Sequence, residues 1–164
     1  MKNPFYTIAF LTVFIFLSCG RSKDTSTDSE IQAKARASID SGHLAFLGAM
    51  RANNTDSLVS LTTPDVEFLP PNDSGHSGKE GLRNWYNGIL AQFKTTEIAV
   101  TDRNVIVSGD WGIERANFTW TLTPVTGGTE STNKCKFIAI WHKLADGSWK
   151  VKYNIWNSSI PPPK

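Results

Sequence analysis

The stretch that decides the fold is residues 65–93, DVEFLPPNDSGHSGKEGLRNWYNGILAQF. It begins with a short apolar strand at 66–69 and turns at Pro70-Pro71. A polar loop follows at 72–77 and leads into a helix whose apolar side chains recur at spacings of three and four. The residues before this stretch have helical periodicity, and those after it alternate as strands do. The sequence therefore predicts helices first and a sheet afterwards.

Two helices are expected before this stretch. The first spans about residues 30–53 and begins with a capping box formed by Ser29 and Gln32. Its apolar side chains form one continuous face. The second helix is short, is capped by Thr55, and is ended by Pro64, because the residue before a proline avoids the α region.

After residue 93 the pattern changes to that of strands. The β-prone runs are 97–101, 105–107, 111–123, 135–144 and 149–156. Asp146-Gly147 is a strong hairpin signal between the last two. This order predicts an α+β domain with three N-terminal helices packed on a cone-shaped curved antiparallel sheet, an α+β roll of the cystatin-like type. Such a sheet encloses a cavity, and cavities of this kind bind small molecules.

The N-terminus has the pattern of an export signal. Lys2 precedes an apolar run at 5–17, which is short for a membrane span. The run ends at 18–20, SCG, which resembles the lipobox of bacterial lipoproteins, although Phe16 stands where that pattern prefers leucine. The resemblance implies cleavage before Cys19 and lipid attachment to it. The alternatives are a simple secretory signal and an uncleaved anchor.

Four segments are expected along the chain. They are a signal peptide at 1–18, lipidated Cys19 with a flexible tether at 19–28, the folded domain at 29–160 and a tail at 161–164. We expect the mature chain in the bacterial cell envelope, held at the membrane through lipid on Cys19 and facing the periplasm or the outside. With Cys19 lipidated, Cys135 has no intramolecular disulfide partner, and we expect it to be a small buried apolar residue.

The composition excludes several classes of function. A formal net charge of +2 on 164 residues gives no basic field, so no nucleic-acid partner is expected. His43, His76 and His142 have no metal-site spacing, and we expect no metal and no cofactor. Ser-His-Asp, P-loop and dinucleotide motifs are absent from the sequence. Six Trp and nine Phe instead favour an aromatic core or pocket.

The order of elements resembles the SnoaL-like and ketosteroid-isomerase-like domains of the nuclear-transport-factor-2 superfamily. The resemblance covers about residues 31–161. It is carried by LVSLTTPDVEFLP at 58–70, GKEGL at 78–82, GDW and TP bounding 109–124, and IW, DGSWK and NIWNS within 140–158. It implies the fold and pairing of sheets face to face into homodimers. It implies no single function, because such folds carry many.

The catalytic groups of the family's isomerases are missing here. Those enzymes use a carboxylate base before the proline that ends the first strand, a tyrosine on the first helix and a protonated aspartic acid on a late strand. The residue before Pro70 is Leu69, which cannot take a proton. The helix positions near Ala45 and Phe46 carry no hydroxyl, and the late strand reads AIW at 139–141. Steroid-isomerase chemistry by that route is therefore disfavoured.

Two residues are candidates for acid–base catalysis. Counting by twos places Glu114 on the apolar face of its strand, so it faces the cavity unless a bulge turns it outward. In the cavity, loss of water should raise its pKa and suit it to proton transfer; a salt bridge to a neighbouring strand is the structural alternative. His76, in the loop before the third helix, is the second candidate, with a solvated loop residue as its alternative.

Ligand-binding residues are expected among the aromatic side chains and one amide. Trp85 and Tyr86 lie on the apolar stripe of the third helix, and a buried phenol needs a hydrogen-bond partner that a ligand can supply. The superfamily resemblance implies that side chains of the last two strands line the pocket. The expected set is Phe68, Trp85, Tyr86, Trp120, Trp141, Asn154 and Trp156.

Three functions stay open at this point. The first is a lipoprotein that binds a small hydrophobic molecule. The second is an isomerase, cyclase or hydratase acting on a hydrophobic carbonyl compound, with Glu114 or His76 as acid or base. The third is a homodimeric interaction module. Polar groups converging in a cavity favour the first two, whereas a cavity filled by Trp and Phe side chains favours the third.

Overall fold

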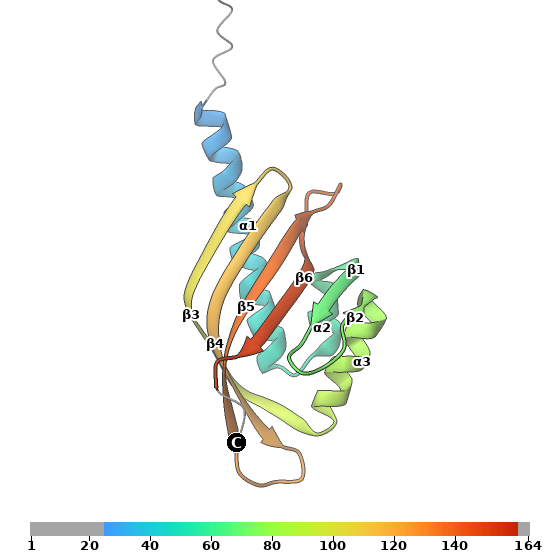
Figure 1. Ribbon diagram of the computed structural model, residues 1–164. Coiled ribbons are helices and arrows are strands. Elements are labelled where there is room, and N and C mark those ends of the chain that lie inside the picture. The colour runs from blue at the N-terminus through green and yellow to red at the C-terminus, as the bar shows by residue number, and fades with distance from the viewer. Residues whose placement is uncertain (1–24, 161–164) are drawn as a thin grey trace, which may run out of the picture.

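The computed structural model describes residues 25–160, so the predictions for the signal peptide, Cys19 and the tail lie outside the described residues. The elements are α1 (Thr25–Arg51), α2 (Thr55–Ser60), β1 (Thr62–Leu69), β2 (His76–Ser77), α3 (Gly78–Leu90), β3 (Phe93–Ser108), β4 (Trp111–Pro124), β5 (Ser131–Lys143) and β6 (Trp149–Ser158). Figure 1 shows α1 lying across one face of a curved, unclosed sheet, with α2 and α3 near β1 and β2. The predicted fold class is confirmed. None of the helices described is long and apolar enough to cross a membrane.

The sheet has six strands in the order β2-β1-β6-β5-β4-β3. Strands β3 to β6 form the predicted antiparallel meander, and the Asp146-Gly147 turn joins β5 to β6 with Gly147 at φ 85°. The prediction of an entirely antiparallel sheet is wrong at β1, which pairs parallel with β6. A parallel pair needs a long connection. Here that connection consists of β2, α3 and strands β3 to β5.

Helix α1 is longer than predicted at its start. It begins at Thr25, so the last four residues of the predicted tether, 19–28, are helical, and Ser29 lies inside the helix rather than at its cap. Helix extension adds one hydrogen bond per residue once a nucleus exists, and Asp28 in the first turn suits the positive end of the helix dipole. The chain leaves α1 at Asn53, which takes φ 51°, as asparagine does beyond helix ends.

The cap of α2 is Asn54 rather than the predicted Thr55. The Asn54 side chain accepts a hydrogen bond from the backbone N–H of Ser57 at 3.0 Å. This bond satisfies one of the free donors at the helix start. Asparagine and threonine are both common capping residues, so the sequence left a choice between neighbours.

Pro64 does not end α2, because that helix already ends at Ser60. It lies inside β1, where the pairing with β6 is interrupted between Thr62 and Glu67. A proline fits there because an interrupted ladder does not need its missing N–H. The parallel pairing then resumes over 67–69.

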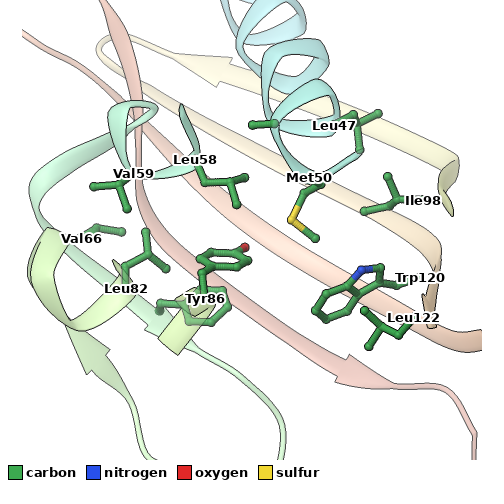
Figure 2. Close-up of a cluster of buried hydrophobic side chains, with 12 residues drawn as sticks. Leu47, Met50, Leu58, Val59, Val66, Leu82, Tyr86, Ile98, Trp120 and Leu122 are labelled. Atoms are coloured by element: carbon green, nitrogen blue, oxygen red, sulfur yellow. The ribbon is translucent and has the colours of Figure 1, made fainter. Parts of the chain in front are cut away.

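The core lies between the helices and the concave face of the sheet. Figure 2 shows one cluster, in which Leu58, Leu82 and Tyr86 lie across from Met50 and Trp120. A second cluster, centred on Ile39 and Trp141, packs against the middle of α1. Burying each such side chain stabilises the fold by about 1.5–3 kcal/mol.

Strand β3 is one continuous strand, where two strands were predicted, and its register against β4 shifts twice, between Thr95 and Glu97 and between Thr101 and Asn104. The bulge at the second shift contains Asp102, which takes φ 52°. Ile98 faces the core before the bulge and Val105 faces it afterwards, so the alternation of side chains changes phase. The bulge thereby directs Arg103 toward the concave face, where it contacts Glu114.

Candidate functional site

A pocket of about 70 Å³ lies between α1, α3 and the concave face of the sheet. The seven side chains predicted to bind a ligand all line it: Phe68, Trp85, Tyr86, Trp120, Trp141, Asn154 and Trp156. Its wall is mostly apolar and aromatic, and residues of both core clusters contribute to it. Such a wall favours apolar ligands and leaves a few polar groups to orient them.

Glu114 faces the pocket from β4, as its strand position predicts, and is 1% exposed. Its Oε1 accepts a hydrogen bond from Arg103 Nε at 2.6 Å and lies 2.7 Å from His43 Nδ1. Its Oε2 accepts a hydrogen bond from Trp141 Nε1 at 2.7 Å. Three side chains from three different elements therefore hold this carboxylate.

The pKa of Glu114 is lowered, which contradicts the expectation that its site would raise it. Burial does act to raise this pKa, but hydrogen bonds from His43 and Arg103 and the attraction of these groups outweigh it. The side chain is therefore a carboxylate at neutral pH. The salt bridge that was the structural alternative is present, and Glu114 is suited to holding a neighbouring group rather than to carrying a proton.

His43 is the site residue that the sequence reasoning missed. It lies on α1, is 8% exposed and lines the pocket. With Nδ1 donating to Glu114, the neutral imidazole has its lone pair on Nε2. The available signal was spacing, since His43 comes four residues after Ile39 and four before Leu47, in the middle of the helix's apolar face.

Arg103 is the second residue that was missed. While its Nε donates to Glu114, its Nη1 donates to Asp40 Oδ1 at 2.5 Å. The Asp40 side chain is 43% exposed, so a chain of charges runs from the surface of α1 to the buried carboxylate. Its Nη2 is buried without a hydrogen-bond partner in the part of the chain described. No sequence signal marked Arg103, because its direction depends on the bulge.

Trp141 is fixed in place by a close approach of α1 to the sheet. A Cβ on Gly42 would lie 2.7 Å from the Trp141 ring, so a residue larger than glycine fits here only if the ring or the helix moves. Gly112, on β4, has the same role opposite Ile39. The indole is 2% exposed and has little room to turn its N–H away from Glu114.

His76 is not among the residues of the pocket wall. Its Nε2 lies 3.2 Å from Asp73 Oδ2, and the same oxygen accepts a hydrogen bond from Trp85 Nε1 at 3.0 Å. Asp73 therefore links the loop before α3 to Trp85, a residue of the pocket wall. The structure brings His43, and not His76, beside Glu114.

The remaining candidates for chemistry are few. Cys135 is buried, and burial raises the pKa of its thiol to about 11, so it is protonated at neutral pH. Over residues 25–160, no group of three or more His, Cys, Asp and Glu side chains is arranged to hold a metal ion.

A sequence profile of the SnoaL-like domain matches residues 44–151. The chain belongs to the SnoaL-like domain family. The match runs from within α1 to the start of β6 and confirms the resemblance to SnoaL-like domains. No functionally curated protein matches the chain.

Solved structures share the fold of this SnoaL-like protein. A ketosteroid isomerase-like protein from Erwinia carotovora atroseptica has a TM-score of 0.70 at 21% identity, covering 76% of this chain and 96% of its own. A type 2 hexachlorocyclohexane dehydrochlorinase has a TM-score of 0.72 at 18% identity, and the match covers 80% of this chain and 90% of the dehydrochlorinase. A candidate scytalone dehydratase from Novosphingobium aromaticivorans has a TM-score of 0.71 at 18% identity, and the match covers 82% of this chain and 89% of the dehydratase. At these identities the likeness shows the fold alone.

Proposed function

We propose that this protein is an enzyme that removes a proton from carbon in a small apolar molecule, with His43 as the general base. The observation that carries the proposal is the 2.7 Å contact between His43 Nδ1 and Glu114 Oε1 in the wall of an apolar pocket. A carboxylate that holds an imidazole in one tautomer is a recurring way to orient a general base.

The residues around the pair have separate roles in this proposal. His43 Nε2 takes the proton, and Glu114 holds the ring and stabilises the imidazolium that forms. Arg103 keeps Glu114 ionised, and the Trp141 N–H fixes the second carboxylate oxygen. A positioned general base contributes about 10²–10⁴-fold to a rate.

We favour elimination as the reaction class. The named activities of two structural relatives, dehydration and dehydrochlorination, both remove a proton from carbon as a leaving group departs. Double-bond isomerisation by the family's carboxylate route is disfavoured, because Leu69 occupies the position of that base. In the proposed reaction, the electrons of the broken C–H bond form the new double bond, and the leaving group departs with its electron pair.

Proton abstraction can be tested without the natural substrate. Cyclohexanone in D₂O exchanges its α-hydrogens when a base removes them, and NMR follows the loss of signal. We expect wild-type protein to accelerate exchange and His43→Gln to lower the acceleration at least about 100-fold. The control His76→Gln, outside the pocket wall, should retain it. Equal exchange by His43→Gln and wild type would remove the proposal.

Ligand carriage without turnover is the second candidate function. It is supported by the mostly apolar and aromatic wall of the pocket. It is also consistent with a Glu114 whose oxygens are already hydrogen-bonded. Saturable binding of small ketones with no exchange in wild type would favour carriage.

We also propose that the mature chain is a lipoprotein of the bacterial cell envelope. The support is the SCG tripeptide after an apolar run in the sequence. Cells expressing the wild type should retain the protein in the membrane fraction with the added mass of lipid, and Cys19→Ser should release it. An unmodified wild-type chain in the soluble fraction would contradict this.

Finally, we propose a homodimer formed through the convex face of the sheet. Four apolar side chains lie in cross-strand register on this face: Ile106, Ile113, Ile140 and Tyr153. Ile138 and Ile155 form a neighbouring pair, and four of these six residues are 45–62% exposed. A second copy presents the same row, so the two surfaces complement each other around a two-fold axis.

A further inference from the structure

Several polar side-chain atoms of the pocket already have protein partners. The indole N–H groups of Trp85, Trp120 and Trp141 each donate to a protein oxygen. His43 Nδ1 contacts Glu114 Oε1, which also accepts a hydrogen bond from Arg103, and Glu114 Oε2 accepts one from Trp141. These groups are satisfied without a ligand.

The Tyr86 hydroxyl differs from these groups. Tyr86 is 4% exposed, and in the part of the chain described its hydroxyl has no hydrogen-bond partner. Figure 2 shows its ring among apolar side chains, with Leu58 and Met50 close by. The hydroxyl oxygen is not among the fully enclosed unpaired atoms, and the pocket reaches the residue. A phenol held out of bulk water calls for a partner from inside the pocket.

The protonation state of the Tyr86 phenol follows from its burial. Burial raises the pKa of Tyr86 well above its usual range, so the group keeps its proton at any physiological pH. It is therefore available as a neutral O–H donor. The complementary group is an oxygen that accepts a hydrogen bond.

The pocket offers no free charge to a ligand. Besides Tyr86, the ionisable side chains of the wall among the described residues are His43 and Glu114, and these are paired with each other. The cation Arg103 does not line the pocket and is held by Glu114 and Asp40. A carboxylate or phosphate in this pocket would be buried without a counter-charge, which is strongly unfavourable.

We infer that the ligand is an uncharged, mainly apolar molecule whose acceptor oxygen takes a hydrogen bond from the Tyr86 hydroxyl. A carbonyl oxygen fits this description. The inference rests on the proposed function only in placing the reactive C–H toward His43, at the α1 side of the pocket. Tyr86 then holds the oxygen from the α3 side and stabilises the negative charge that reaches it as the proton leaves.

The experiment compares two probes of one shape on two proteins. Cyclohexanone and methylenecyclohexane differ in an oxygen against a methylene group, and Tyr86→Phe removes only the hydroxyl. Affinities come from NMR titration of the folded protein. The ratio of ketone to hydrocarbon affinity should be about five- to tenfold higher in wild type than in Tyr86→Phe, the value of one hydrogen bond. An equal ratio in the two proteins overturns the inference, as does failure of both probes to bind wild type.

Further measurements distinguish this inference from a protein partner for Tyr86, from a charged ligand and from the proposed reaction. The free Tyr86→Phe protein should melt at the wild-type temperature or above, because an unpaired hydroxyl has no protein partner to lose. A fall of several degrees would show such a partner and overturn the inference. Tighter binding of cyclohexanecarboxylate than of cyclohexanone would do the same. The affinity ratio is measured without turnover, so a failed exchange assay removes the proposed reaction and leaves the Tyr86 contact standing.

Discussion

At the scale of single residues, the charge of Glu114 depends on its partners. A carboxylate that is 1% exposed has lost nearly all of its hydration, which by itself favours the neutral acid. Arg103, His43 and Trp141 compensate for that loss. Removing one partner of a buried pair is costly, because the other charge stays behind without compensation.

Replacement of Arg103 by methionine should therefore lower the free energy of unfolding by about 3 kcal/mol at neutral pH. In wild type the folded-state pKa of Glu114 is lowered, so its stabilisation is complete above the unfolded pKa and is lost as pH falls through the folded one. Without Arg103, burial should raise the folded pKa, and the carboxylate should become destabilising at neutral pH. The difference between Arg103→Met and wild type should thus shrink as pH falls toward about 4.

Urea denaturation from neutral to acidic pH measures this difference. The matched control is Arg115→Met, because Arg115 pairs with Asp102 at 2.8 Å while both side chains are more than half exposed. Exposed pairs contribute about 0–1 kcal/mol, so this variant should stay close to wild type. An Arg103→Met deficit that does not change with pH would contradict the assigned role.

At the scale of elements, two local features determine where α1 packs and where Arg103 points. Gly42 lets α1 approach Trp141 closely, one residue before His43. The bulge at Asp102 changes the phase of β3 and directs Arg103 inward. The position of His43 and the charge of Glu114 therefore depend on how closely one helix packs on the sheet and on the irregularity of one strand.

Alanine at Gly42 tests the seating of α1. In a helix interior, alanine is ordinarily better than glycine by about 1 kcal/mol. At Gly42 the added Cβ would meet the Trp141 ring at 2.7 Å, so we expect a net destabilisation of about 1–3 kcal/mol. Gly48→Ala is the control on the same helix, because nothing lies within 4 Å of its added Cβ, and it should stabilise by about 0.5–1 kcal/mol. Equal gains in thermal unfolding for both variants would contradict the close contact.

At the scale of the whole molecule, the two faces of the sheet have different roles. The concave face packs on the helices and holds the pocket. The convex face carries the row of Ile106, Ile113, Ile140 and Tyr153. Pairing two copies through the convex face leaves each pocket intact on the other side of its own sheet.

Lysine at Ile113 tests the proposed dimer. In mature protein carrying Cys19→Ser, light scattering after size exclusion should give the mass of two chains at micromolar concentration. Ile113→Lys should give one chain, because two charges would meet within an apolar contact. Leu44→Lys is the control, since Leu44 is 68% exposed on α1, away from the convex face, and should stay dimeric. A wild-type mass of one chain would contradict the proposal.

The sequence by itself determined the features that depend on spacing within one element. These include the apolar stripe of α3, the Asp146-Gly147 hairpin and the inward direction of Glu114. Periods of 2 and 3.6 residues set the direction of a side chain wherever a strand or helix is regular. For that reason Trp85, Tyr86 and Trp120 line the pocket as their spacing predicts, whereas the pocket residues of the last two strands were predicted from the family resemblance.

The tertiary structure alone decided the features that join distant parts of the chain. The parallel pairing of β1 with β6, the inward direction of Arg103 and the contact of His43 with Glu114 have no signal within a single element. The direction of the Glu114 pKa follows the same division. The sequence showed that the carboxylate would be buried, whereas folding brought His43 and Arg103 to it, and their hydrogen bonds and attraction outweigh the loss of water.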